Sequence, residues 1–323
     1  NIPEIVAFIE ELVEKGYAYE SGGDVYYRTS KFPGYGKLSH KRLDELQYGI
    51  RVEVDERKEN PQDFVLWKGA KPGEINWPSP WGNGRPGWHI ECSAMARKFA
   101  GVTLDIHGGG HDLQFPHHEC EIAQSEALTG APLARYWMHN GFVNINNEKM
   151  SKSLGNVINV RELLKRTSAQ AIRYVMLATH YRSPLNFSDE TIRQAENSVS
   201  RLATCRDNVK HRLAGTPDGA EAASADERLQ RRLMELAEQF QAKMNDDFNT
   251  ADAVTAWFQL VSEANAYLQR ERVSPDDLRL ILKLFEEFDG ILGLLPPESE
   301  GGLLDEEIEA LIAERTEARK ARN

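Results

Sequence analysis

Residues 102–121 read VTLDIHGGGHDLQFPHHECE, and this stretch decides the fold. The β-branched run Val102–Ile106 predicts a short buried strand. The three glycines that follow predict a tight turn at the carboxyl end of the strand, where backbone can approach a ligand closely. Pro116 suits the first turn of a helix, which we expect to run from His117 to a stop at Gly130. A strand, a glycine turn and a helix in this order are typical of open α/β sheets, which bind their ligands at that edge.

The predicted helix carries a candidate pair of metal ligands. His117 and Glu121 are four residues apart, so both lie on one helix face. An imidazole and a carboxylate at this spacing are common metal ligands, and a solvated helix face is the alternative. Cys120 is a competing ligand that the spacing does not exclude. Cys92 offers a soft ligand elsewhere in the chain, or else is a small buried core residue.

Composition places the chain among globular proteins. Its 323 residues are enough for two or more domains, with 41% hydrophobic and 28% charged residues. There is no apolar run of membrane-spanning length and no signal peptide, and three cysteines form no disulfide framework, so we expect a cytoplasmic protein. The net charge of −11 argues against nucleic-acid binding by the chain as a whole, although a local basic patch could still bind RNA. The chain begins inside a helix without an initiator Met, as a fragment would.

The rest of the chain predicts an α/β part followed by an all-α part. Before the glycine stretch we expect a helix over 1–16, a hairpin over 17–29 that turns at 21–23, a helix over 39–46, irregular chain over 61–88 and a helix over 88–101. After it we expect a strand near 136–146 and helices over 160–181, 189–213, 226–245, 250–270 and 275–293, with polar linkers at 214–227 and 296–302.

Residues 149–156 read KMSKSLGN and form the sharpest motif. Lys149 and Lys152, held by Ser151 and Ser153 on a mobile loop, suit a polyphosphate. Their ammonium groups can swing onto charge that grows on the phosphates in the transition state. The alternative is an ordinary solvated loop, which a five-residue identity after an α/β unit disfavours.

KMSKSLGN is similar to the signature of class I aminoacyl-tRNA synthetases. Longer segments resemble the cysteinyl-tRNA synthetase family in particular: GRPGWHIECSAM (84–95), HGGGHDLQFPHHECEIAQSE (107–126), VYYRTSKFPGYGKLS (25–39), HYRSPLNFSDE (180–190) and DDFNTADA (246–253). The resemblance implies the second half of a Rossmann-type nucleotide fold with an inserted connective domain, followed by an all-α helical bundle. The expected domains are the connective domain (1–80), the catalytic half with zinc site and KMSKS loop (81–181), a tRNA-binding bundle of the DALR type (182–295), and a linker with the start of a truncated anticodon-binding region (296–323).

The resemblance also implies one zinc ion, held in the family by two cysteines, a histidine and a glutamate. Cys92, His117 and Glu121 occupy matching positions, and the other family cysteine is absent from this chain. Cys120 falls where the family usually has Asn. Zinc binds a thiol as thiolate, whereas the harder and less acidic hydroxyl of serine loses that bond, so the selection of cysteine needs no editing.

The family further implies a wall for the cysteine side chain at Trp88, although core packing is the alternative. His89, His107 and His139 fall where the family gathers histidines under its site. Each of these histidines alone would more often be a satisfied core residue.

The resemblance implies that ATP binds at the end of the strand that precedes His111 and at the KMSKS loop. Gly110 and Asp112 match the Gly-x-Asp that contacts the nucleoside, with Asp112 accepting from ribose hydroxyls. Capping of the following turn is the alternative for Asp112. Lys152 is the expected phosphate-contacting lysine, and Lys149 assists it.

The resemblance predicts a ligase of protein biosynthesis that acts as a monomer. It would activate cysteine with ATP and Mg²⁺ to cysteinyl-adenylate and transfer the cysteinyl group to tRNA(Cys). In-line displacement at phosphorus needs no nucleophilic side chain. The His-Ile-Gly-His motif of the family is not in these 323 residues, so we expect this chain alone to be inactive or weak. Two alternatives stay open: the paralogue that ligates cysteine to an amino sugar in mycothiol synthesis, and a non-catalytic fragment that binds zinc and RNA.

Overall fold

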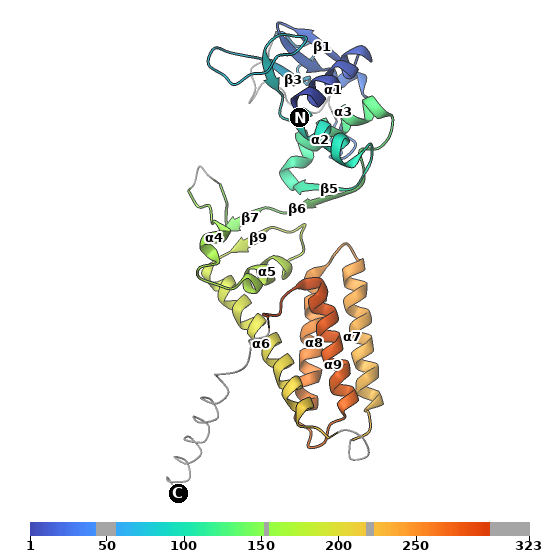
Figure 1. The fold of residues 1–323 in the computed structure, drawn as a ribbon, viewed down its shortest axis with the longest axis vertical. Coiled ribbons are helices and arrows are strands. Elements are labelled where there is room, and N and C mark those ends of the chain that lie inside the picture. The colour runs from blue at the N-terminus through green and yellow to red at the C-terminus, as the bar shows by residue number, and fades with distance from the viewer. Residues whose placement is uncertain (43–55, 152–154, 218–222, 298–323) are drawn as a thin grey trace. The chain divides into compact units, whose positions relative to one another are not determined.

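The computed structural model describes residues 1–42, 56–151, 155–217 and 223–297. The chain divides into two compact units, Asn1–Phe142 and Val143–Asn323, which are described separately (Figure 1). Among the described residues, no helix is both long and apolar enough to cross a membrane. The helix expected over 39–46 falls largely outside the described residues, as do the linker and chain that follow residue 297.

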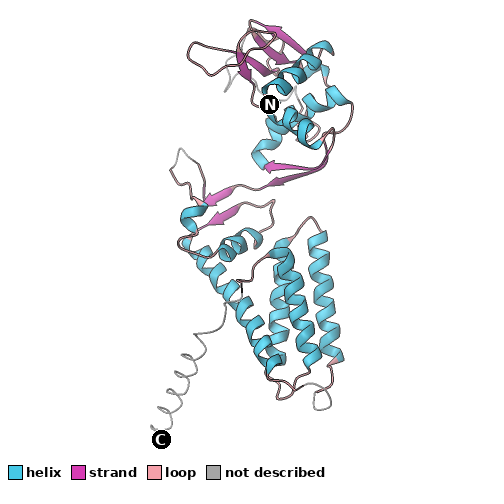
Figure 2. Cartoon of the chain, in the orientation of Figure 1, coloured by secondary structure: helices cyan, strands magenta, loops and turns pink. Residues whose placement is uncertain are grey.

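The first unit opens with an antiparallel sheet covered by helices (Figure 2). Its elements are α1 (Ile2–Glu14), β1 (Ala18–Ser21), β2 (Asp24–Tyr27), a 3-10 turn η1 (Thr29–Lys31), β3 (Phe64–Gly69) and β4 (Gly84–Pro86), with strand order β1-β2-β3-β4. The expected hairpin is confirmed, and Gly22 and Gly23 take positive φ angles of 62° and 82° in its two-residue turn. Fully buried side chains join α1, the sheet and the helix α2 (Ile90–Ala100) into one core: Ile9, Leu12, Tyr27, Trp67 and Ile90.

The expectation of irregular chain over 61–88 is wrong for two segments, because β3 and β4 lie within it. The prolines that suggested irregular chain do not interrupt a central strand. Pro86 ends β4, the last strand in the sheet order, and the other prolines fall outside the strands. Edge strands and strand ends tolerate proline because no ladder hydrogen bond is lost there.

The second half of the first unit is a strand-helix-strand arrangement. It contains α2 (Ile90–Ala100), β5 (Leu104–Gly110), a 3-10 turn η3 (His111–Leu113), a π-helical turn η4 (Gln114–His118), α3 (Glu119–Thr129) and β6 (Ala134–Asn140), with β5 and β6 parallel. The predicted stop at Gly130 is confirmed by its left-handed φ of 71°. The regular helix begins two residues later than expected, because Phe115 has an extended backbone (φ −138°, ψ 131°) and a π turn follows it.

Two expectations for the glycine stretch are wrong. Gly108–Gly110 belong to strand β5 and form no tight turn. Their small size lets two neighbours approach: a Cβ on Gly108 would lie 2.7 Å from the Met138 carbonyl oxygen, and one on Gly109 would lie 3.0 Å from the His118 ring. Nor is the strand buried, since Ile106 is 57% exposed. Successive side chains alternate between the faces of a strand, and no described element covers the face of Ile106.

The second unit combines a small sheet with a helical bundle (Figure 1). Its strands are β7 (Val143–Ile145), β8 (Glu148–Lys149) and β9 (Leu185–Phe187), in the order β8-β7-β9. Its helices are α4 (Val160–Leu163), α5 (Ala169–Leu177), α6 (Asp189–Ala214), α7 (Glu227–Asn245), α8 (Thr250–Leu268) and α9 (Pro275–Leu292). The four long helices match the expected ranges, while the range 160–181 contains two short helices and β9 was not foreseen. Buried side chains from α6 to α9 form the bundle core, among them Leu202, Leu233, Trp257 and Phe285.

Candidate metal centre

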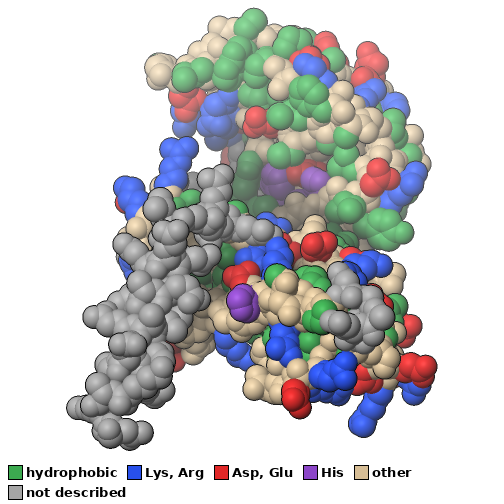
Figure 3. Space-filling view, turned by 60° about the horizontal axis from the view of Figure 1, so that its bottom comes forward, with side chains coloured by type: hydrophobic (Ala, Val, Ile, Leu, Met, Phe, Trp, Pro, Cys, Tyr) green, Lys and Arg blue, Asp and Glu red, His purple; other side chains and the backbone are tan. Residues whose placement is uncertain are grey.

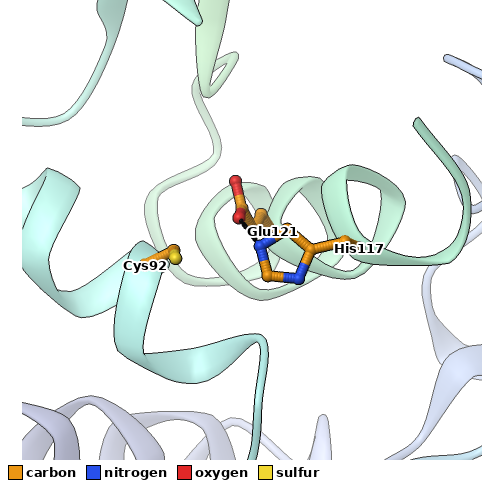
Figure 4. Close-up of side chains that lie close together, drawn as sticks. All are labelled: Cys92, His117 and Glu121. Atoms are coloured by element: carbon orange, nitrogen blue, oxygen red, sulfur yellow. Dashed lines mark ion pairs between the residues drawn. The ribbon is translucent and has the colours of Figure 1, made fainter. Parts of the chain in front are cut away.

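Three predicted ligands come together between α2 and α3 (Figure 4). Cys92 projects from α2, His117 lies in the π turn η4 and Glu121 lies in the first turn of α3. Their donor atoms lie within 4.8 Å of one another. His117 Nε2 is 2.6 Å from Glu121 Oε1. His117 and Glu121 are buried, whereas Cys92 is exposed, so its interpretation as a core residue is wrong.

The donor chemistry of this cluster fits zinc. Sulfur, imidazole nitrogen and carboxylate oxygen are the atoms that zinc binds in proteins, and three protein ligands leave a position for a substrate atom. Glu121 is only 2% exposed, and a carboxylate buried to this extent needs cationic or hydrogen-bonding partners. Desolvation, followed by the charge of Glu121, raises the pKa of the Cys92 thiol to about 11, so without a cation this thiol stays protonated.

Cys120 does not share in this cluster. It is 1% exposed, and its Sγ lies 3.2 Å from the hydroxyl of Tyr35. Burial holds the pKa of the Cys120 thiol well above its ordinary value. Neither group of donor atoms found among the described residues includes this cysteine.

Histidines continue the polar network on both sides of Glu121 (Figure 3 shows histidine and acidic side chains together on the first unit). His107 Nε2 is 2.6 Å from Glu121 Oε2, and His89 Nδ1 is 2.8 Å from His117 Nδ1. His118 Nδ1 is 2.8 Å from His139 Nε2. The structure therefore places all three histidines implied by the resemblance in this network.

The sequence places His118 in the same helical turn as His117 but assigns it no role, although the HH doublet at 117–118 was a signal for it. Burial lowers the pKa of His118 to about 4. Burial and the neighbouring His117 likewise lower the pKa of His89 to about 4. Both rings are neutral near pH 7, so each can accept a hydrogen bond or coordinate a cation.

Trp88 lies over the histidine network and outside the core. Its side chain is 68% exposed, so the core-packing alternative is wrong. The indole ring stacks 5.4 Å from the ring of His89 and lies 5.0 Å from that of His117. It forms an apolar wall at the edge of the metal cluster.

The two residues matched to nucleoside binding lie at the carboxyl end of β5. Gly110 is its last residue, and a Cβ there would lie 2.6 Å from Asp112 Oδ1. Asp112 is exposed in η3, and within the described ranges no side chain caps η3 or the following turn η4 by a hydrogen bond, so Asp112 does not cap that turn.

The KMSKS loop belongs to the second unit. Lys149 is exposed at the end of β8, whereas Lys152 and Ser153 lie outside the described residues. Asn156 joins the two sides of the loop: its Oδ1 accepts from the Ser151 amide at 2.9 Å, and its Nδ2 donates to the Lys149 carbonyl at 3.2 Å. This role of Asn156 was not predicted, although the residue is part of the quoted motif.

A buried carboxylate holds the start of α3. Glu119 is fully buried, and its oxygens accept from the amides of Gly36 (3.0 Å), Leu38 (2.7 Å) and Ser39 (2.6 Å) and from the Ser39 hydroxyl (3.0 Å). Residues 36–39 are thereby fixed to the helix that carries Glu121. Sequence reasoning missed this contact, because no local pattern links positions 80 residues apart.

Family models match most of the chain. One described as "tRNA synthetases class I (C) catalytic domain" matches residues 1–197, and one described as "DALR domain" matches residues 239–296. Among solved structures, Mycobacterium tuberculosis methionyl-tRNA synthetase bound by methionyl-adenylate is similar, with a TM-score of 0.62 and 14% identity, covering 90% of this chain and 72% of that one. At that identity the likeness shows the fold alone.

Curated relatives match over the whole chain. The cysteine--tRNA ligase of Shouchella clausii is 57% identical over 323 residues, which are 100% of this chain and 68% of that relative. The cysteine--tRNA ligase of Brevibacillus brevis is 57% identical and is covered to 69%. This chain thus spans about two thirds of the length of these relatives. It belongs to the cysteine--tRNA ligase family of class I tRNA synthetases.

Proposed function

We propose that the chain provides the cysteine-selecting centre and part of the ATP site of a ligase that activates cysteine with ATP and Mg²⁺ and transfers it to tRNA(Cys). The observation that carries this proposal is the convergence of Cys92, His117 and Glu121 within 4.8 Å. Zinc held by these three side chains would favour a substrate thiolate over the hydroxyl of serine.

The histidines around Glu121 orient the ligands. His89 faces His117 Nδ1 and so leaves Nε2 as the ligand nitrogen, because a ring nitrogen engaged in a hydrogen bond fixes the tautomer of the other. His107 holds the second oxygen of Glu121 and restrains the carboxylate. Trp88 shelters the substrate side chain from water, and His139 supports the network through His118.

ATP binding is assigned to two places in the chain. Asp112 accepts from ribose hydroxyls beside Gly110, where the absence of a side chain lets the nucleoside approach. Lys149 and Lys152, with Ser151 and Ser153, bind the phosphates and neutralise charge that grows during in-line displacement.

The proposal includes the domain division given above (1–80, 81–181, 182–295 and 296–323) and a monomeric, cytoplasmic enzyme. The DALR match at 239–296 supports tRNA binding by the helical part.

The test is zinc content by elemental analysis, together with cysteine-dependent ATP–pyrophosphate exchange by the protein that the complete gene encodes. We expect one zinc per chain and exchange that serine does not support. Cys92→Ser should weaken zinc binding by more than the roughly 10–100-fold that loss of an outer-shell partner costs.

Cys120→Ser is the matched control, because serine can keep the contact with Tyr35, and it should retain zinc. Transfer of cysteine to tRNA(Cys) rather than to an amino sugar would distinguish the tRNA ligase from the amino-sugar ligase of mycothiol synthesis. A protein without zinc and without exchange would leave only a binding fragment and overturn the proposal.

A further inference from the structure

Glu121 uses its two oxygens toward different partners. Oε1 lies 2.6 Å from His117 Nε2, on the side of Cys92, and Oε2 lies 2.6 Å from His107 Nε2. A second group of donor atoms, from His107, His118 and Glu121, also lies within 4.8 Å. The two groups share only the carboxylate.

This second group has the chemistry of a cation site. Two imidazoles and a carboxylate oxygen suit divalent ions of the later first transition row. Ligands of tetrahedral zinc at about 2.0–2.1 Å from the ion lie roughly 3.4 Å apart, so small side-chain rotations would close the group around an ion. The His107 side chain is 20% exposed, which leaves a path for an ion from solvent.

The surroundings orient both rings as they do in metal sites. His118 Nδ1 pairs with His139 Nε2 at 2.8 Å, and ligating histidines typically have their other nitrogen held in this way. The His107 ring stands edge-on to Trp137, with ring centroids 4.8 Å apart. Gly109, on the same face of β5 as His107, leaves the space that the His118 ring fills.

We propose that His107, His118 and Glu121 form a second, weaker site for a divalent cation such as zinc, with Glu121 bridging two ions. The inference rests on the proposed function, because the first ion shares Glu121. Two-metal sites with ions about 3.5–4 Å apart are common in proteins. Repulsion between the two dications makes the second ion bind at least about tenfold more weakly than the first.

The test is a Co²⁺ titration of the chelator-treated chain, with bound metal counted by equilibrium dialysis. The first site should give a thiolate-to-cobalt charge-transfer band that depends on Cys92, whereas the second site has no sulfur ligand and adds none. We expect two ions per chain in the unchanged protein and one in His118→Gln, whose amide is a poor ligand. A charge-transfer band that persists in this variant reports that the first unit is folded.

The matched control is His111→Gln, which removes an exposed histidine from the adjacent turn and should keep two ions. If His118→Gln fails to fold, His107→Gln replaces it in the same titration. Saturation at one ion with the band, or a second ion that survives both variants, would overturn the second site. A protein that binds one ion without the charge-transfer band, and loses that ion in His118→Gln, would instead overturn the proposed thiolate centre and support the second site.

Discussion

Two adjacent histidines take different partners, which shows how finely position decides a residue's role. Successive side chains in a helical turn point about 100° apart. His117 therefore faces Glu121 and His89, whereas His118 faces His139 and Gly109. The sequence shows that His117 and His118 are adjacent, but it does not show which parts of the chain pack against each ring.

Asn156 connects the two sides of the KMSKS loop by hydrogen bonds to Ser151 and Lys149. In Asn156→Ala both side-chain hydrogen bonds across the loop are lost, at about 1 kcal/mol net each. We expect the rate of cysteine-dependent ATP–pyrophosphate exchange by the complete enzyme to fall roughly tenfold. The KM for cysteine should stay unchanged, since the residues that we propose to select cysteine lie in the first unit.

Asn159→Ala is the control for this effect. Asn159 caps α4 by accepting from the Arg161 amide at 2.9 Å, and its loss should cost about 1 kcal/mol of stability without slowing exchange. Equal slowing by the two variants would mean that Asn156 acts only through general stability.

At the scale of elements, the start of α3 depends on chain from another part of the first unit. The loop at 36–39 directs three amides and a hydroxyl at the buried carboxylate of Glu119, so its oxygens have hydrogen-bond donors from the backbone. This contact fixes the start of the helix that carries Glu121, directly after the π turn that carries His117.

Glu119→Gln tests this contact. The amide keeps one acceptor but sets an N–H group against backbone N–H donors, so the first unit should lose about 2–3 kcal/mol of unfolding free energy in urea. Ser39→Ala removes one hydrogen bond and should cost about 1 kcal/mol. A Glu119→Gln protein no less stable than Ser39→Ala would contradict the assignment.

The helical bundle carries a prediction for alkaline pH. Burial of Cys205, on α6, raises the pKa of its thiol to about 11, against about 9 in the unfolded chain. Between these values the unfolded state has released the proton and the native state has kept it, so stability falls as pH rises. From pH 8 to pH 10 the contribution of this group should fall by about 1.4 kcal/mol.

The measurement compares urea unfolding of the bundle at the two pH values with and without Cys205→Ala. The Cys205→Ala protein should be less stable at pH 8 because the substitution leaves a cavity. The difference in unfolding free energy between the two proteins should be smaller at pH 10. A constant difference would show that the thiol titrates normally in the native state.

For the whole molecule, the proposed metal ligands and the bundle core belong to different units. Cys92, His117 and Glu121 lie within residues 1–142, whereas the cluster around Trp257 and Phe285 lies in the second unit. A ligand that binds only one folded unit stabilises that unit by mass action, by about 2.7 kcal/mol at 100 times its Kd.

Chelation of zinc should therefore lower the melting temperature of one calorimetric transition and leave the other in place. The shifted transition should be the one that Glu119→Gln also lowers, and the constant one should respond to Cys205→Ala. A chelator that shifts both transitions equally would show that the two units unfold together.

Sequence reasoning succeeded where information is local and failed where it is not. The long helices α6 to α9 follow from periodicity, and the four-residue spacing of His117 and Glu121 predicts that their side chains lie together. The strand character of Gly108–Gly110 depends on pairing with β6, and the partners of Glu119 lie about 80 residues away. Neither kind of contact leaves a pattern within a short window.

Gly36 and Glu119 are 83 positions apart in the chain, and this separation determines how long after the loop Glu119 is made on the ribosome. At about 5–20 residues per second, Glu119 is polymerised roughly 4–16 s after the loop whose amides it accepts from. The nascent chain therefore completes this contact late, several seconds after the loop itself has been made.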